Sequence, residues 1–264
     1  MLLCCCALAL ALIGCNKKKT ETVSTAVPAT ETGKIDGVLA GKKFAVGTDT
    51  SFVPFCFPDS NNEYVGFDID MLKALSEKLG FTYTLSPMDF TALLMSVQSK
   101  KLDIGVAGVT IKPERQQVMD FSTPYYDAGL LVLVRKENTD ITGINDLAGK
   151  VIALKEGTSS VDYVTEHITN AKRVVTFPNI ENAYLEVERG AADAVVYDSP
   201  NILYYLTTNT NSDCKAVGDL FDAAQYGIIL QKGSPYTEYI NKALAEFKSD
   251  GTYDRIYAKW FGTK

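Results

Sequence analysis

The stretch AGKKFAVGTDTS at Ala40–Ser51 returns later in the chain as AGKVIALKEGTS at Ala148–Ser159. In both copies a polar start leads into an apolar run that is typical of a buried strand. A second pair of segments follows in the same order, since Leu102–Gly108 and Ala192–Asp198 each read as a strand after an amphipathic helix. Two similarities in matching order predict two lobes of similar construction.

Strands and helices alternate between these segments. Lys43–Gly47 is predicted to be a strand, and the next helix to begin at Asp68 as its cap and to end at Gly80. Its apolar positions are Ile69, Leu72, Leu75 and Leu79. Strands at 81–85 and 102–107 flank a second helix, which we expect Asp89 to cap. This alternation favours an α/β fold with mostly parallel sheets and helices on both faces.

The composition is that of a globular protein. With 264 residues, 46% of them hydrophobic and 22% charged, the chain can bury one large core or two moderate ones. The net charge is -6 and the isoelectric point is about 5.0. Because binding to phosphates needs clustered Lys and Arg, we expect no nucleic-acid partner.

The N-terminus is typical of an exported lipoprotein. Met1–Ile13 is an uncharged apolar run that is too short to span a bilayer but suits a signal peptide. The small residue Gly14 precedes Cys15, as in a bacterial lipobox, so we expect residues 1–14 to be removed and Cys15 to carry lipid. The alternative, a buried helix, does not explain the abrupt change to a Lys run at 17–19.

A polar tether follows the lipidated cysteine. Residues 15–40 are rich in Thr, Lys, Glu, Ser and Ala and show no apolar period, so we expect a solvated linker whose lysines lie near lipid headgroups. Apart from the anchor, the mature chain keeps only Cys56 and Cys214. These cysteines lie far apart and need not pair, so no disulfide framework is expected.

The ends of the predicted strands indicate a binding cleft. In open α/β sheets the ligand crevice lies beyond the carboxyl ends of the strands. The residues there are Asp49 and Gly108 in the first half and Lys155 and Asp198 in the second, with Arg115 close behind Gly108. Converging opposite charges without a set of metal ligands suit a zwitterion, so we expect neither metal nor cofactor.

From about residue 43 to residue 262 the chain resembles the family 3 extracellular solute-binding proteins, which serve polar amino acid importers, and most closely the glutamine-binding members. The similarity rests on several motifs in the family's order: Thr48–Phe55, Tyr64–Asp68, Pro87–Phe90, Ala107–Thr110, Glu114–Arg115, Asp120–Ser122, Asp198–Leu203 and Lys259–Gly262. Each motif is weak alone, but so many in order are specific.

The resemblance implies roles at the backbone end of an amino acid. Arg115 would hold the α-carboxylate through a bidentate pair, with help from Thr110 and from backbone donors near Ser159. Asp198 and the carbonyl of Gly108 would accept from the α-ammonium. By composition alone, Arg115 and Asp198 would more often be surface charges than site residues.

The resemblance also implies a side-chain end. Phe52 and Phe90 would sandwich the aliphatic part, although either ring could be plain core. The far end would lie between Asp49 and Lys155, and an amide suits this pair because it both donates and accepts. The alternative is that Asp49 and Lys155 pair with each other across the cleft.

Two positions depart from the glutamine-binding pattern. Ser159 stands where those members carry Gly, and Tyr197 stands where they carry His before the cleft Asp. Ser159 still offers its N–H and adds a hydroxyl, while Tyr197 can donate without carrying charge. Amino acid binding is therefore expected to survive both changes.

Catalysis is the weaker hypothesis. His167 is the only histidine and falls in a polar helix outside every motif, so we expect it on the surface. No phosphate-binding loop, nucleophile elbow or zinc motif occurs. A dehydratase on the same fold and a ligand-sensing receptor remain alternatives, and we expect binding rather than an enzyme.

The expected architecture implies a mechanism. One lobe would comprise residues 41–126 and 227–264 and the other residues 127–226, with hinges near Tyr125–Gly129 and Asp222–Tyr226. Closure around a small polar amino acid would precede delivery to an ABC permease. We expect a monomer in the cell envelope, anchored to the membrane by lipid and facing the periplasm or the exterior.

Overall fold

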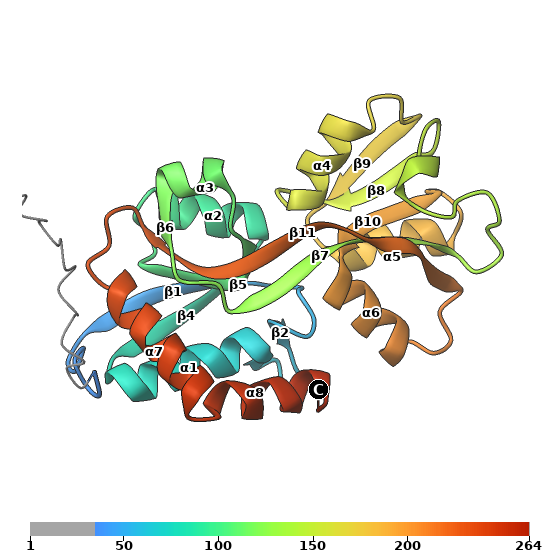
Figure 1. The fold of residues 1–264 in the computed structure, drawn as a ribbon. Helices are drawn as coiled ribbons and strands as arrows, with labels where there is room; N and C mark the ends of the chain where they lie inside the picture. The colour runs from blue at the N-terminus through green and yellow to red at the C-terminus, as the bar shows by residue number, and fades with distance from the viewer. Residues whose placement is uncertain (1–34, 264) are drawn as a thin grey trace, which may run out of the picture. The chain divides into compact units, whose positions relative to one another are not determined.

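A computed structural model describes residues 35–263 and shows the two-lobed α/β architecture that the sequence predicts (Figure 1). One sheet of nine strands runs through both lobes, with the order β4-β1-β5-β11-β7-β10-β8-β9 and with β6 paired to β11. The proposed signal peptide, Cys15 and nearly all of the tether lie outside the described residues. No helix within residues 35–263 is long and apolar enough to cross a membrane.

The first lobe is built on parallel strands. These are β1 (Lys43–Asp49), β4 (Thr82–Met88) and β5 (Ile104–Thr110), and β1 pairs with both of the others. Around them lie β2 (Phe57–Pro58), β3 (Tyr64–Val65), α1 (Phe67–Leu79), α2 (Phe90–Gln98), α3 (Pro113–Val118), β6 (Met119–Phe121), α7 (Thr237–Ser249) and α8 (Thr252–Phe261). Helices α1, α7 and α8 pack together on one face, while α2 covers the other (Figure 1).

The second lobe repeats this construction. Its parallel strands are β8 (Val151–Lys155), β9 (Arg173–Phe177) and β10 (Ala194–Asp198), and its helices are α4 (Ser159–His167), α5 (Ile180–Glu188) and α6 (Ser199–Thr208), after a short 3-10 turn at Ile144–Asp146. Side chains of β10 alternate between two cores, since Val195 packs with α5 and Val196 with α4. The sheet is therefore covered on both faces.

Matching backbone bridges confirm the internal repetition. The N–H of Asp103 donates to the carbonyl of Ala45, and the N–H of Ala45 donates to the Asp103 carboxylate at 2.8 Å. In the second lobe the N–H of Asp193 donates to the carbonyl of Val151, whose own N–H donates to the Asp193 carboxylate at 2.7 Å. Each bridge lies at the amino end of its strands, so the opposite, carboxyl ends remain open to form a site.

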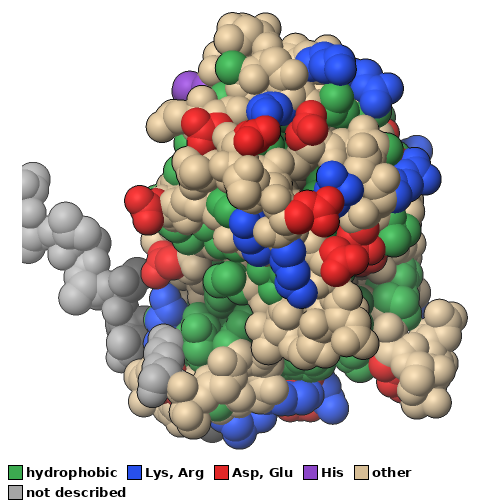
Figure 2. All heavy atoms as spheres, turned by 90° about the vertical axis from the view of Figure 1, so that its right-hand side faces the viewer, with side chains coloured by type: hydrophobic (Ala, Val, Ile, Leu, Met, Phe, Trp, Pro, Cys, Tyr) green, Lys and Arg blue, Asp and Glu red, His purple; other side chains and the backbone are tan. Residues whose placement is uncertain are grey.

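Two long strands join the lobes. β7 (Tyr126–Arg135) and β11 (Cys214–Gln231) run antiparallel, and both carry residues of each lobe. The segments predicted as hinges pair directly with one another, because Tyr126 opposes Tyr226 and Ala128 opposes Ala224. The face of the molecule in Figure 2 carries acidic and basic side chains interspersed, as is ordinary for a solvated surface.

Some element boundaries differ from the predictions. The strand expected at 81–85 runs from Thr82 to Met88, and the strand expected to end by Gly108 continues to Thr110. Asp68 does not cap α1, because the helix begins at Phe67 with Gly66 in the cap position. Gly66 is required there, since a Cβ would lie 2.1 Å from the carbonyl oxygen of Phe55. Asp89 occupies the N-cap position of α2, as predicted. Among the described residues, however, no side chain accepts a capping hydrogen bond from the first N–H groups of this helix.

Candidate functional site

A small cavity lies where the carboxyl ends of the strands of both lobes meet. It is lined by Asp49, Phe52, Phe90, Ala107, Gly108, Thr110, Arg115, Thr158, Ser159, Tyr197 and Asp198. Every residue predicted for the site except Lys155 therefore faces this one space, and Ala107 and Thr158 join them. The topology explains the convergence, because Asp49 ends β1 and Asp198 ends β10.

Arg115 brings a buried positive charge to the cavity. Its side chain projects from α3, with Nη1 donating to the carbonyl of Thr110 and Nη2 to the carbonyl of Gly157, each at 3.0 Å. The guanidinium carbon lies 5.6 Å from the centre of the Phe90 ring. Burial lowers the pKa of Arg115, but an arginine stays charged in proteins. Arg115 forms no ion pair with any carboxylate in residues 35–263, so a cation remains available to an incoming anion.

Asp198 provides the opposite charge. Its Oδ1 accepts a hydrogen bond of 2.6 Å from the hydroxyl of Tyr226, which the hinge strand β11 contributes. Burial raises the pKa of Asp198 to about 6, while the Tyr226 hydroxyl and the charges of Arg115 and Lys155 act in the opposite direction. Tyr226 was predicted only as a hinge boundary, and the pairing of β11 with β7 across the hinge brings its hydroxyl to Asp198.

Helix α4 adds backbone donors to the cavity. It begins at Ser159, where the sequence analysis placed such donors, and no side chain of the described residues caps its N–H groups. The neighbouring hydroxyl of Thr158 is otherwise engaged, since it donates to the carbonyl of Lys155 at 2.8 Å and contacts Ser160. An uncapped helix start carries partial positive charge. It therefore adds to the field of Arg115 at this end of the cavity.

Lys155 does not line the cavity, unlike the other residues predicted to contact the ligand. Its ammonium is fully buried behind the cavity wall, where it forms an ion pair with Asp49 and donates to the carbonyl of Ser51 at 3.1 Å. Asp49 itself lines the cavity. The alternative in which Asp49 and Lys155 pair across the cleft is thus the arrangement in this structure. The pair presents little net charge to its end of the cavity.

Aromatic rings form the remaining walls. Phe52 and Phe90 are both buried and belong to the core cluster, and both also line the cavity. Gly108 lies against Phe52 with φ at +54°, and a Cβ there would lie 2.2 Å from a carbon of the Phe52 ring. Tyr197 meets Phe52 edge-on at 6.0 Å. Only glycine fits beside Phe52 at this position.

Several contacts outside the cavity hold the lobes together. Lys112 forms an ion pair with Asp162 at 2.9 Å, and the Asn201 amide donates to the carbonyl of Val53 at 2.6 Å. The hydroxyl of Ser51 contacts Asn179 at 3.1 Å. Each of these contacts joins residues of different lobes, so the structure is in a closed conformation.

A sequence profile of the bacterial extracellular solute-binding proteins, family 3, matches residues 44–263. The chain belongs to this family. The ABC transporter arginine-binding protein 1 of Escherichia coli K12 is 31% identical over 229 residues, which are 85% of this chain and 93% of that protein. A solved ancestral arginine-binding protein bound to glutamine is 43% identical with a TM-score of 0.80, covering 83% of this chain and 98% of its own. An ancestral amino acid-binding protein, described as a precursor of cyclohexadienyl dehydratase, is 38% identical with a TM-score of 0.77, covering 83% and 95% of the two chains.

Neither the histidine nor the two cysteines of the described residues line the cavity. His167 is exposed in the last turn of α4 and stacks on Tyr163 at 4.3 Å between ring centres. Cys56 and Cys214 are buried and form no disulfide in the described part of the chain. Residues 35–263 contain no group of His, Cys, Asp and Glu side chains that could hold a metal ion. The chemistry of the cavity therefore rests on its paired charges and aromatic rings.

Proposed function

We propose that this solute-binding protein captures a polar amino acid, with glutamine preferred, by closing its lobes around it, and delivers it to the permease of an ABC importer. The observation that carries the proposal is the cavity between the lobes, with buried Arg115 and Asp198 on its walls. An α-amino acid carries both complementary charges on adjacent groups. Arg115 and the start of α4 would hold its carboxylate, and Asp198 with the Gly108 carbonyl would accept from its ammonium.

The paired charges at the other end favour a neutral side chain. Because Lys155 neutralises Asp49, a cationic ligand side chain is attracted less than it would be by a lone carboxylate. An anionic side chain would still lie against the carboxylate oxygens of Asp49 and be repelled by them. An amide can donate to Asp49 without adding charge. The ancestral arginine-binding protein that was solved bound to glutamine supports this choice.

At each end of the cavity the lining residues contact residues of the other lobe, and this arrangement would allow ligand binding to drive closure. Arg115 reaches from the first lobe to Gly157 of the second, and Asp49 reaches Lys155. A ligand that contacts both lobes only in the closed form shifts the population toward it. We place the hinges at Tyr125–Gly129 and Asp222–Tyr226, with lobe boundaries near residues 126 and 227.

A thermal melt with each common amino acid tests the proposed function. A ligand that binds only the folded state stabilises it by about 2.7 kcal/mol at a hundredfold excess over Kd. Glutamine should therefore raise Tm by several degrees and lower the radius of gyration in small-angle scattering. If no amino acid does either, or if one is chemically consumed, the proposed function is wrong.

The anchor is proposed on the sequence of residues 12–15 alone. Cys15→Ser should release the protein from membranes into the soluble exported fraction, because serine cannot take the lipid that the lipobox-like junction directs to Cys15. Fractionation followed by immunoblotting measures this. Cys56→Ser is the matched control and should leave the distribution unchanged; equal membrane association of both variants would exclude the anchor.

Asp49→Asn should lower the ratio of glutamine affinity to glutamate affinity by a factor on the order of ten. The change removes the repulsion of a ligand carboxylate and leaves Lys155 as an unpaired cation. Competition titrations against both ligands give the ratio of affinities. Asp162→Asn is the control, since Asp162 also joins the lobes but lies outside the cavity lining. Selectivity that stays constant in Asp49→Asn would show that Asp49 does not meet the side chain.

A further inference from the structure

Asp68 is a buried carboxylate that the proposed binding contacts do not use. It lies in the first turn of α1 and is 1% exposed. Its Oδ2 accepts the N–H of Gly108 at 2.7 Å, and its Oδ1 accepts the hydroxyl of Tyr125 at 2.8 Å. Among the described residues it has no cationic partner. A buried carboxylate is costly unless hydrogen-bonded, so these two bonds define its environment.

The first bond reaches the cavity. Gly108 adopts the left-handed region with φ at +54°, and glycine has the freest backbone of any residue. By holding this N–H, the Asp68 carboxylate fixes the peptide plane that precedes Gly108, from which φ and ψ of Gly108 set the direction of its carbonyl. That carbonyl is the acceptor for the ligand ammonium in the proposed function, on which this inference rests. The negative charge of Asp68 lies within hydrogen-bond distance of the backbone N–H of the same residue.

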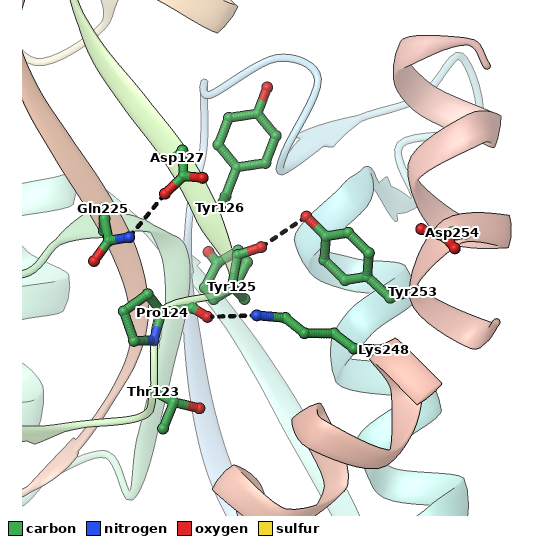
Figure 3. A pocket seen from close by; sticks show the side chains of 9 residues that line it. All are labelled: Thr123, Pro124, Tyr125, Tyr126, Asp127, Gln225, Lys248, Tyr253 and Asp254. Carbon is green, nitrogen blue, oxygen red and sulfur yellow. Dashed lines mark hydrogen bonds between the residues drawn. The ribbon is translucent and has the colours of Figure 1, made fainter. Parts of the chain in front are cut away.

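The second bond reaches the hinge. Tyr125 immediately precedes β7, and its N–H donates to the carbonyl of Tyr226 at 3.0 Å. Its own carbonyl accepts the hydroxyl of Tyr253 at 2.8 Å, while Lys248 donates to the carbonyl of Pro124 at 3.2 Å (Figure 3). Helices α7 and α8 therefore hold the backbone here, while Asp68 of α1 accepts the Tyr125 hydroxyl.

Asp68 and Asp198, the two carboxylates near the proposed ammonium subsite, are connected through the hinge. Asp68 holds Tyr125, Tyr125 bonds to the backbone of Tyr226, and the Tyr226 hydroxyl holds Asp198. Strands β7 and β11 pair at this point, with Tyr126 opposite Tyr226. A rotation between the lobes would act on this chain of contacts.

We propose that Asp68 is a positioning residue, which aims the Gly108 carbonyl at the ligand ammonium and couples it through Tyr125 to the hinge. The ionised carboxylate is the competent form, because it accepts both hydrogen bonds strongly and adds negative charge next to Gly108. A protonated Asp68 loses that charge and accepts the Gly108 N–H more weakly.

This role makes ligand affinity depend on pH. Burial raises the pKa of Asp68 to about 7, although the bonds from Tyr125 and Gly108 act against the rise. The other titratable groups near it are the Tyr125 hydroxyl and the Cys56 thiol, whose pKa values are both raised, first by burial and then by carboxylates. Neither titrates near neutrality, so affinity should rise as pH increases through about 7 and fall below it. Asp198, with its pKa near 6, adds a separate and lower step.

The test compares three variants by calorimetric titration with glutamine from pH 5.5 to 8.5. Asp68→Asn should weaken binding roughly tenfold at pH 8 and lose the step near pH 7 while keeping the lower one. Tyr125→Phe removes a bond that favours the ionised form, so its step should move to higher pH. Asp103→Asn is the matched control, since Asp103 also accepts a backbone N–H in this lobe but lies at the amino ends of the strands. Asp103→Asn should keep the glutamine affinity of the unaltered protein and both pH-dependent steps.

The Gly108 amide resonance in NMR gives a readout without ligand. It should shift with a midpoint near pH 7 in the unaltered protein, at higher pH in Tyr125→Phe, and show no such step in Asp68→Asn. A step near pH 7 that persists in Asp68→Asn, or affinity equal to that of the unaltered protein at pH 8, would overturn the inference. If Asp68→Asn does not fold, a midpoint unchanged in Tyr125→Phe overturns it. Failure of the unaltered protein to bind any amino acid would instead refute the proposed function, and the amide titration would still test the contact.

Discussion

Arg115→Ala is expected to weaken glutamine binding by about 2–5 kcal/mol, or roughly 30- to 5000-fold in Kd. The reason is that the ligand α-carboxylate would lie among buried side chains without its cation. The loss should be similar for glutamine and glutamate, because every amino acid carries the same carboxylate. Calorimetric titration of the variant against both ligands measures it.

Two further variants separate the guanidinium from general charge effects. Arg115→Lys keeps the charge but cannot form a bidentate pair, so it should recover only part of the affinity. Lys112→Ala removes a cation of the same lobe whose ion pair with Asp162 lies outside the cavity lining, and it should cost far less. A larger loss from Lys112→Ala than from Arg115→Ala would place the carboxylate elsewhere.

Lys155→Met should weaken glutamine binding roughly a hundredfold or more. In the closed form Asp49 would be buried beside a thioether, and an uncompensated buried charge costs about 3–5 kcal/mol. In an open form Asp49 can meet water, so the cost falls on closure. Small-angle scattering of the variant should show a larger radius of gyration than the unaltered protein at the same glutamine concentration.

The double variant Asp49→Asn/Lys155→Met tests whether this pair acts as a unit. Removing both charges eliminates the unpaired carboxylate, so the double variant should bind better than Lys155→Met alone, with an interaction energy of opposite sign to the single losses. Strictly additive losses would mean that the two side chains contact the ligand independently and not each other.

The strand ends of the site could be predicted from the sequence because they follow from topology. Asp49, Lys155 and Asp198 each end a parallel strand, and parallel strands of one sheet direct their carboxyl ends to one edge. The internal sequence repetition then predicted that the fold has two such edges, one in each lobe. Family motifs added Arg115 and the aromatic walls, which periodicity alone could not distinguish from core.

Other features depend on contacts between distant segments, which no local pattern encodes. Asp68 reads as a helix cap because it precedes an apolar helical pattern, but the close approach of Gly66 to Phe55 starts the helix earlier and turns the carboxylate inward. Tyr226 reaches Asp198 only through the pairing of β11 with β7. Lys155 was placed on the correct strand end, while its full burial depends on how tightly the lobes close.

Calorimetric titration of the lipid-free protein against glutamine, glutamate and arginine is the decisive measurement of amino acid capture. We expect binding with one site per chain, glutamine tightest of the three, and the amino acid recovered unchanged after dissociation. Absence of binding heat with every amino acid, or recovery of a chemically altered product, would contradict it.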